Sequence, residues 1–133
     1  MTNTGIDPIT YACIDYWESF KFYMDNLGMY QVRHWRNLPI ETQNVCRIQL
    51  MEHFIEGPYM ISPETEHETW RARKERLGHT TKGMIYDEQE KISPMIKPYS
   101  QLDPRLETVS EMVVDIFGSH VPKIKEYYMN LTM

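Results

Sequence analysis

The sequence predicts a mainly α-helical fold, a small domain of four to five helices with an ordered loop or short hairpin. Three segments begin with a capping residue followed by proline and end at a glycine: Asp7-Pro8 to Gly28, Ser62-Pro63 to Gly78, and Asp103-Pro104 to Gly118. Proline suits the first helical position, the preceding side-chain oxygen caps free amides, and glycine tolerates the left-handed exit. Each segment is therefore expected to be a helix with both ends marked.

Apolar periodicity supports each element in chain order. In the first segment, residues three and four apart form one buried face, the spacing of an α-helix: Ile9, Cys13, Tyr16, Trp17, Phe20, Met24 and Leu27. A second helix is expected from about residue 41 to 56, ending at Gly57-Pro58. Residues 79–102 lack a helical period and predict an ordered loop, with a small hairpin left open. After the helix that ends at Gly118, a separate short helix is expected beyond Pro122.

Composition excludes several classes of protein. The chain has 133 residues, 41% of them hydrophobic and 25% charged, and it has no apolar run near the ~18 residues that a membrane helix needs. The N-terminus has neither a basic flank nor an apolar stretch, so a cytoplasmic location is expected. A net charge of -5 disfavours binding to duplex nucleic acid. We therefore expect one compact unit with neither a membrane nor duplex DNA as a partner.

Catalytic and metal-binding patterns are not found in the sequence. The two cysteines, Cys13 and Cys46, lie among helix-like residues and are expected to be buried free thiols. The five histidines form no H-E-x-x-H pair, and no cysteine pair has ligand spacing. No G-x-S-x-G nucleophile accompanies His67-Glu68. We expect no catalytic residue, no metal site and no cofactor.

The segment around Trp70 carries the strongest functional signal. Helical spacing places His67, Trp70, Arg73 and Lys74 on roughly one side, so the indole is expected on an open, charged face. An aromatic plane beside cations can stack on a nucleobase and neutralise its phosphate. A half-buried, purely structural tryptophan is the alternative that this pattern leaves open.

Residues 64 to about 118 resemble the ryanodine-receptor (RyR) domain family. The resemblance rests on His67-Glu68-Thr69-Trp70 and on the residues that follow in register: Lys74, Gly78, Gly83, Asp87, Lys91, Pro94, Ile96, Pro98, Tyr99 and Leu102. The chain departs from the family pattern at four places: His79 replaces a tryptophan, one extra residue separates Gly78 from Gly83, Lys82 replaces a tyrosine, and Ser93 replaces a histidine.

The resemblance implies a non-enzymatic helical module with a cleft for a nucleotide or nucleotide-derived ligand. Residues 61–133 would be the ligand-binding domain, and residues 1–60 a helical extension packed on it. Trp70 would be the stacking platform, Lys74 the phosphate partner and His79 a second stacking surface. The implied ligand-binding set is His67, Trp70, Arg73, Lys74, His79, Lys82, Asp87, Lys91, Pro98 and Tyr99. Family members of this kind suggest a sensor or sequestering protein, such as a phage sponge for an immune signalling nucleotide in the host cytoplasm.

The sequence leaves alternatives open for the function and for the segment before the second helix. The alternative function is a protein–protein interaction module that acts as a homodimer, since the RyR domains of the large calcium-release channels occur in pairs. His34-Trp35, just before Pro39, is either a second wall of the cleft or a packed connector. A nucleotide hydrolase would need a nucleophile or metal site that the sequence lacks.

Overall fold

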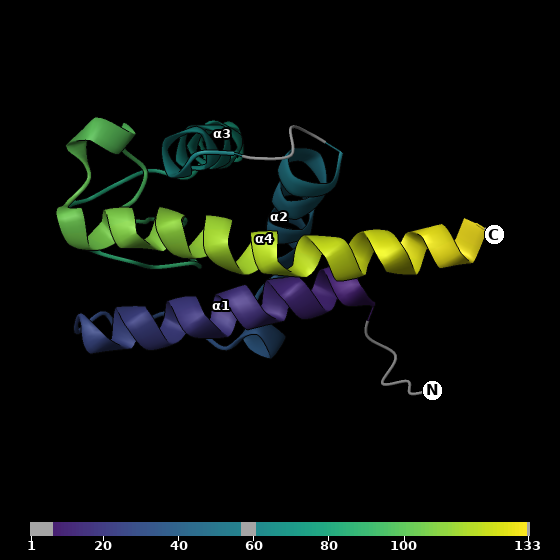
Figure 1. Cartoon of the computed structure of the whole chain (residues 1–133). Coiled ribbons are helices and arrows are strands. Elements are labelled where there is room, and N and C mark those ends of the chain that lie inside the picture. Colours follow the sequence, from purple (N-terminus) through teal and green to yellow (C-terminus); the bar gives the residue numbers. More distant parts are fainter. Residues whose placement is uncertain (1–6, 57–60, 133) are drawn as a thin grey trace.

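The computed structural model describes residues 7–56 and 61–132, and it confirms a mainly helical fold. The helices are α1 (Pro8–Asn26), α2 (Ile40–Leu50), α3 (Pro63–Arg76) and α4 (Pro104–Thr132) (Figure 1). Helix α2 continues into a π-helical turn, η2 (Met51–Ile55), and two 3-10 turns, η1 (Trp35–Asn37) and η3 (Tyr99–Gln101), lie in the connections.

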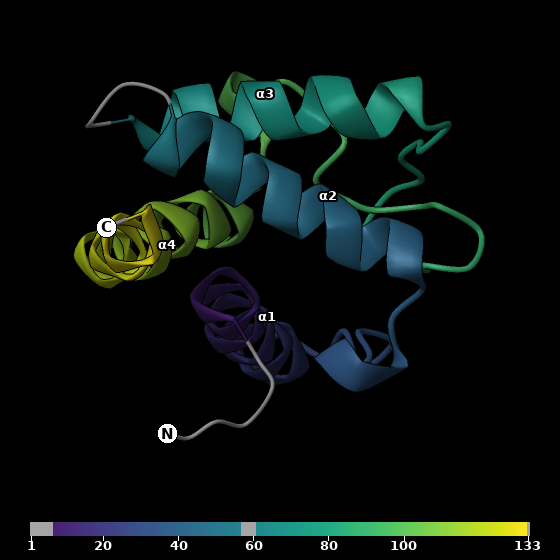
Figure 2. The same ribbon diagram turned by 90° about the vertical axis from the view of Figure 1, so that its right-hand side faces the viewer.

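The helices form two crossed layers. Helices α1 and α4 run antiparallel side by side, and α2 and α3 lie across them in a second layer. Figure 2 looks along α1 and α4, while α2 and α3 extend across the view. The loop from residue 77 to 103 connects the end of α3 to the start of α4 along one side of this arrangement. All four helices and the loop therefore enclose one interior.

Local capping accounts for the ends of α1 and α3, as the sequence predicts. The Asp7 carboxylate accepts a hydrogen bond from the backbone N–H of Thr10 at 2.8 Å. The Ser62 hydroxyl accepts one from the backbone N–H of Thr65 at 3.1 Å. After each helix a glycine takes the left-handed conformation, with φ of 86° at Gly28 and 92° at Gly78. These are local interactions, so the sequence is sufficient to predict them.

Helix α4 corrects the prediction of two separate C-terminal helices. It continues through Gly118 and keeps Pro122 in its interior. Gly118 is not among the glycines with positive φ, so it does not terminate the helix. Beyond it, Ile124 is fully buried in the core, and His120 Nε2 lies 2.8 Å from a carboxylate oxygen of Asp15 on α1. Packing against α1 therefore overrides the local signals that favour a break.

The second helix and the loop also differ in detail from expectation. Helix α2 begins at Ile40, and its π-helical turn reaches Ile55. The predicted end at Gly57-Pro58 lies outside the described residues. Between α3 and α4 the structure describes turns and isolated bridges, Thr80 with Ile92 and Asp87 with Ile92, in place of a hairpin.

The core draws on the whole described chain. A single buried cluster includes Phe20 and Met24 of α1, Leu50 of α2, and Leu106 and Phe117 of α4. Helix α1, from the first half of the sequence, thus contributes as directly to the core as α4 does. None of the helices in the described residues has the apolar length that a membrane span requires.

Replacing Pro122 with alanine is expected to stabilise the protein. The proline removes one backbone donor from the interior of α4 and crowds the carbonyl of Gly118, a combination that costs up to about 3 kcal/mol. Pro122→Ala should therefore raise the free energy of unfolding by about 1 to 3 kcal/mol, measured by urea denaturation. Pro104→Ala is the matched control, because Pro104 occupies the first helical position and should give no gain. Equal or lower stability for Pro122→Ala would contradict this account.

Candidate functional site

Helix α3 turns a polar face toward the interior. Glu66, Trp70 and Lys74 follow one another at four-residue spacing, which places them on one side of the helix. Glu66 is 4% exposed and Lys74 is 7% exposed, while Trp70 is half-buried and packs against the core. The expectation of an open, charged face is therefore wrong. This face of α3 carries ionisable residues, but most of them are buried against the rest of the protein.

A cavity of about 60 Å³ lies against this face of α3. Trp70 and Lys74 border it from α3, and His79 borders it from the start of the loop. Aromatic rings from α1, α4 and the loop form much of the remaining wall: Tyr16, Trp17, Phe20, Tyr86 and Phe117. The cavity thus combines apolar walls with a few polar groups, the usual character of small-molecule sites.

Lys74 is the cation of the cavity. Its Nζ lies 6.0 Å from the centroid of the Trp70 ring, within the range of a cation–π contact. Among the described residues, the Lys74 ammonium makes no hydrogen bond or ion pair. Burial lowers the pKa of Lys74 to about 8, although the charges of Cys46, Glu41 and Glu88 act in the opposite direction.

Two polar side-chain atoms at the cavity also lack hydrogen-bond partners within the part of the chain that is described. These are His79 Nε2 and Glu88 Oε1, both buried. The guanidinium Nε of Arg33 lies 3.8 Å from Glu88 Oε1, which allows charge attraction but is too long for a hydrogen bond. Burial, together with the charges of Lys74 and Lys91, lowers the pKa of His79 to about 4, so its ring is neutral at pH 7. Buried polar atoms normally find partners, so these two atoms indicate room for a guest or for water.

Glu66 is a buried carboxyl group at another part of the same cavity. Burial raises its pKa to about 8, so it is mostly protonated at neutral pH. The side-chain amide of Gln49 donates to Glu66 Oε2 at 3.3 Å and to the backbone carbonyl of Glu66 at 3.0 Å. The same amide also donates to the Thr69 hydroxyl at 2.9 Å. Gln49 thus ties α2 to the inner face of α3.

Arg73, predicted as a ligand contact, belongs to this helix–helix junction. Its guanidinium donates to the Gln49 side-chain carbonyl at 2.6 Å and forms a close ion pair with Glu52. Arg73 does not line the cavity. Its contacts explain how α3 is held against α2 and η2.

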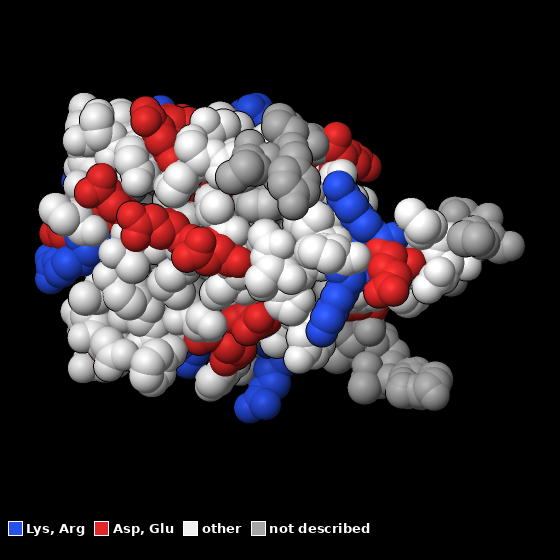
Figure 3. Space-filling view, in the orientation of Figure 1, with Lys and Arg blue, Asp and Glu red and all other residues white. Residues whose placement is uncertain are grey.

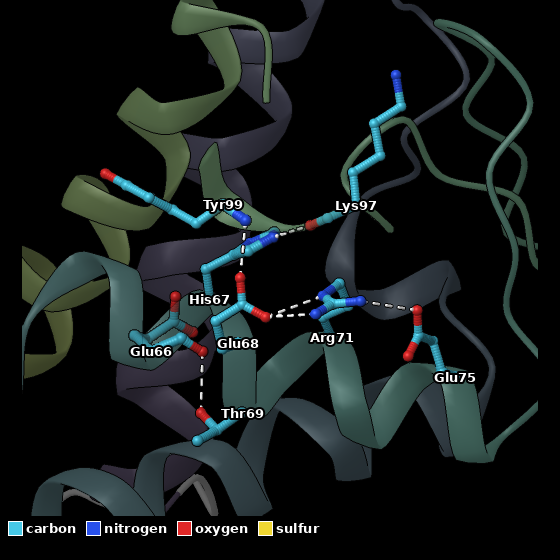
Figure 4. A network of polar contacts seen from close by, with 8 residues as sticks. All are labelled: Glu66, His67, Glu68, Thr69, Arg71, Glu75, Lys97 and Tyr99. Carbon is cyan, nitrogen blue, oxygen red and sulfur yellow. Dashed lines mark hydrogen bonds and ion pairs between the residues drawn. The ribbon is translucent and has the colours of Figure 1, made fainter. Parts of the chain in front are cut away.

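A second network holds the loop to α3 (Figure 4). Glu68 accepts the backbone N–H of Tyr99 at 2.7 Å and pairs with Arg71 at 2.6 Å. His67 Nε2 donates to the backbone carbonyl of Lys97 at 2.7 Å, and the His67 ring lies 5.8 Å from that of Tyr99. Burial lowers the pKa of His67. The network fixes residues 97–99, including Pro98, so His67 and Tyr99 position the loop outside the main cavity.

The remaining predicted residues lie away from the cavity. Lys82 is exposed on the outer part of the loop. The Asp87 carboxylate accepts the backbone N–H groups of Gln89 and Glu90 and shapes a turn. Lys91 donates to the backbone carbonyl of Leu77 at 3.0 Å. Of the predicted set, Trp70, Lys74 and His79 line the main cavity, and His67 borders a smaller hollow that Trp70 also lines.

Sequence reasoning missed Glu66 and Glu88, the two acids at the cavity. Glu66 could have been found, because it precedes Trp70 by four residues and so shares its face. Glu88 lies in a loop without periodicity, so no local pattern points to it. Trp35, considered as a second wall, is buried in η1 under the Arg47 guanidinium at 5.4 Å and does not line the cavity. The connector interpretation fits that position.

The outer surface offers little for a polyanion on the face shown in Figure 3. Acidic side chains lie across the middle of this face, and basic ones lie toward its margins. This distribution matches the net charge of -5. Across residues 7–56 and 61–132, no group of three or more metal-ligating side chains is found.

Glu66→Gln is expected to remove a pH-dependent loss of stability. The unfolded chain releases the Glu66 proton near pH 4.5, whereas the folded chain keeps it until about pH 8. Between these values the folded state binds more protons, so the stability contributed by Glu66 falls as pH rises. Glutamine cannot ionise and still accepts from Gln49. Glu66→Gln should therefore be more stable than wild type at pH 8 by a few kcal/mol, with a smaller difference at pH 5.

The measurement is urea unfolding of both proteins at several pH values between 5 and 9. Glu64→Gln provides the matched control, since Glu64 is exposed on the same helix and should show no such pH-dependent difference. A Glu66→Gln protein that is less stable than wild type at pH 8 would show that Glu66 is ionised and well stabilised.

Comparisons with protein-family models, curated proteins and solved structures return no significant match for this chain. The resemblance to the RyR domain therefore stays a prediction. The function has to be argued from the geometry around Trp70, Lys74 and His79.

Proposed function

We propose that the chain is a non-enzymatic binding protein for a small nucleotide-type ligand, whose planar base enters the cavity beside Trp70. The observation that carries this proposal is the single cavity that Trp70, Lys74 and His79 share. An indole and a neutral imidazole offer two aromatic surfaces, and Lys74 offers a cation without a partner among the described residues. A base edge presents both donors and acceptors, which suits the Lys74 ammonium together with the unpartnered atoms of His79 and Glu88.

Binding of a base requires the cavity to open. A cavity of about 150 Å³ accommodates benzene in another protein, and the cavity here measures about 60 Å³. The movable wall is the loop, because Tyr86, Glu88, Ile92 and Ser93 line the cavity while residues 80–85 are exposed. Isolated bridges and turns hold this segment together, with far fewer ladder hydrogen bonds than a sheet has. Such segments open at low free-energy cost compared with helices of the core.

The test is a thermal-shift and tryptophan-fluorescence screen against ATP, cyclic nucleotides and ADP-ribose isomers. A ligand at about 100-fold excess over Kd should stabilise the fold by about 2.7 kcal/mol. Lys74→Met should weaken binding at least tenfold, because it removes the only cation that lines the cavity in the described chain.

Lys82→Met is the matched control for this screen. Lys82 belongs to the set implied by the resemblance, but it is exposed and outside the cavity, so its loss should leave Kd unchanged. Trp70→Ala is a poorer probe, because Trp70 packs against the core and its truncation would also destabilise the fold. A panel that changes neither melting temperature nor fluorescence would remove the support for a nucleotide ligand.

A second candidate function, a homodimeric interaction module, is favoured by a different observation. Large apolar side chains are exposed on α1 and the connection after it, with Phe22 70% exposed and Tyr30 73% exposed. Apolar surface that is left exposed to this degree is a candidate contact surface for a second copy of the chain. Static light scattering at about 10 to 100 μM should then give twice the monomer mass, and Phe22→Ser should reduce it. A monomer mass throughout this range would exclude a homodimer of useful affinity.

A further inference from the structure

The Lys74 amine is the feature of the interior that the proposed function does not fully explain. Lysines are rarely buried unless they are paired. Lys74 is 7% exposed, and within the described residues its amine meets the Trp70 ring but no carboxylate at ion-pair distance. The amine borders the cavity, so a guest can reach it.

The other polar groups at this end of the cavity favour a neutral guest over an anion. His79 Nε2 and Glu88 Oε1 have no hydrogen-bond partner among the described residues, and an anion bound to Lys74 would lie close to the Glu88 carboxyl group. A neutral carbonyl compound avoids this repulsion. It also offers the electrophilic carbon with which a buried lysine amine characteristically reacts.

We propose that Lys74 forms an imine with a small aldehyde or ketone that enters the cavity. The amine nitrogen attacks the carbonyl carbon, the carbonyl oxygen takes up a proton, and the resulting carbinolamine loses water. Overall, the Lys74 ammonium and R–CHO become a protonated imine and H₂O, and neither an oxidant nor a reductant is consumed. This inference does not rest on the nucleotide proposal, since it concerns the cavity in its present, closed size.

Two properties of the site support the reaction. First, burial lowers the pKa of Lys74 to about 8, so about a tenth of the Lys74 side chains carry the reactive neutral amine at pH 7. Second, the Glu88 carboxylate acts on the charge of Lys74, and burial raises the pKa of Glu88, so this group is suited to accept the proton that the ammonium loses. In its closed form the cavity of about 60 Å³ restricts the guest to a few heavy atoms, so an aromatic aldehyde fits only after the loop opens.

The experiment is reductive trapping on the full-length protein. Limiting acetaldehyde and sodium cyanoborohydride at pH 7 convert each imine to a stable ethyl group, and peptide mass spectrometry measures labelling at each lysine. Lys74 should be labelled at least ~10-fold faster than the exposed Lys82 and Lys123, because burial lowers the pKa of Lys74 and so enlarges the fraction of its amine that is neutral. Labelling of Lys74 no faster than of Lys82 would overturn the proposal.

Two further arms test the location and the proton acceptor. Benzaldehyde should show a weaker preference for Lys74 than acetaldehyde does, because it fits only after the loop opens; an equal preference for the two aldehydes would place the reactive amine outside the cavity and overturn the proposal. Glu88→Gln should slow labelling of Lys74 and leave Lys82 unchanged, which separates a local effect from unfolding. Unfolding would instead equalise the rates of the two lysines. The wild-type comparison between Lys74 and Lys82 needs no variant, so a Lys74 variant that fails to fold leaves the test intact.

Discussion

The desolvation of the inner face of α3 is the constraint on which the rest of the structure depends. An ionised side chain moved from water into an apolar interior costs several kcal/mol unless it is paired or neutralised. The fold meets this constraint differently at each position. Glu66 is mostly protonated and accepts a hydrogen bond from Gln49. His67 donates a hydrogen bond to the Lys97 carbonyl. Lys74 borders the cavity, and burial lowers the pKa of its ammonium group. The arrangement of α2 and of the loop follows from these requirements.

The parts of the fold that the sequence predicts are those fixed by local interactions. The ends of α1 and α3 depend on a capping oxygen, a proline and a left-handed glycine within a few residues, and all of these are visible in the sequence. The same signals at Gly118 and Pro122 mislead, because the continuation of α4 is decided by packing of Val121 and Ile124 far along the chain from their partners. Local propensity is weak compared with such tertiary contacts.

The candidate site also has a part that the sequence predicts and a part that depends on tertiary contacts. Helical spacing is enough to place Trp70 and Lys74 on one face, but it cannot say whether that face meets water. The charged composition of α3 favours solvent, and only the arrangement of Gln49, the loop and α1 encloses it. Glu88 and Tyr86 reach the cavity from a segment without a repeating pattern, so their contribution depends on the path of the loop. The resemblance to the RyR domain implied that Arg73, Asp87 and Lys91 contact the ligand. In this structure their side chains instead make hydrogen bonds within the protein.

Folding alone is a poor explanation for a cavity lined by ionisable groups. The side chains that line an empty cavity lose dispersion contacts on that side. Buried ionisable residues are also often less stabilising than apolar residues of the same volume. Filling the space with a larger apolar side chain at Lys74 or Glu66 would serve the core better on both counts. An occupant changes this balance, because it restores contacts in the cavity and supplies partners to Lys74 and to the unpartnered atoms of His79 and Glu88. Since a ligand that binds only the folded state stabilises that state, the destabilising features of the empty site are the ones that couple binding most strongly to folding.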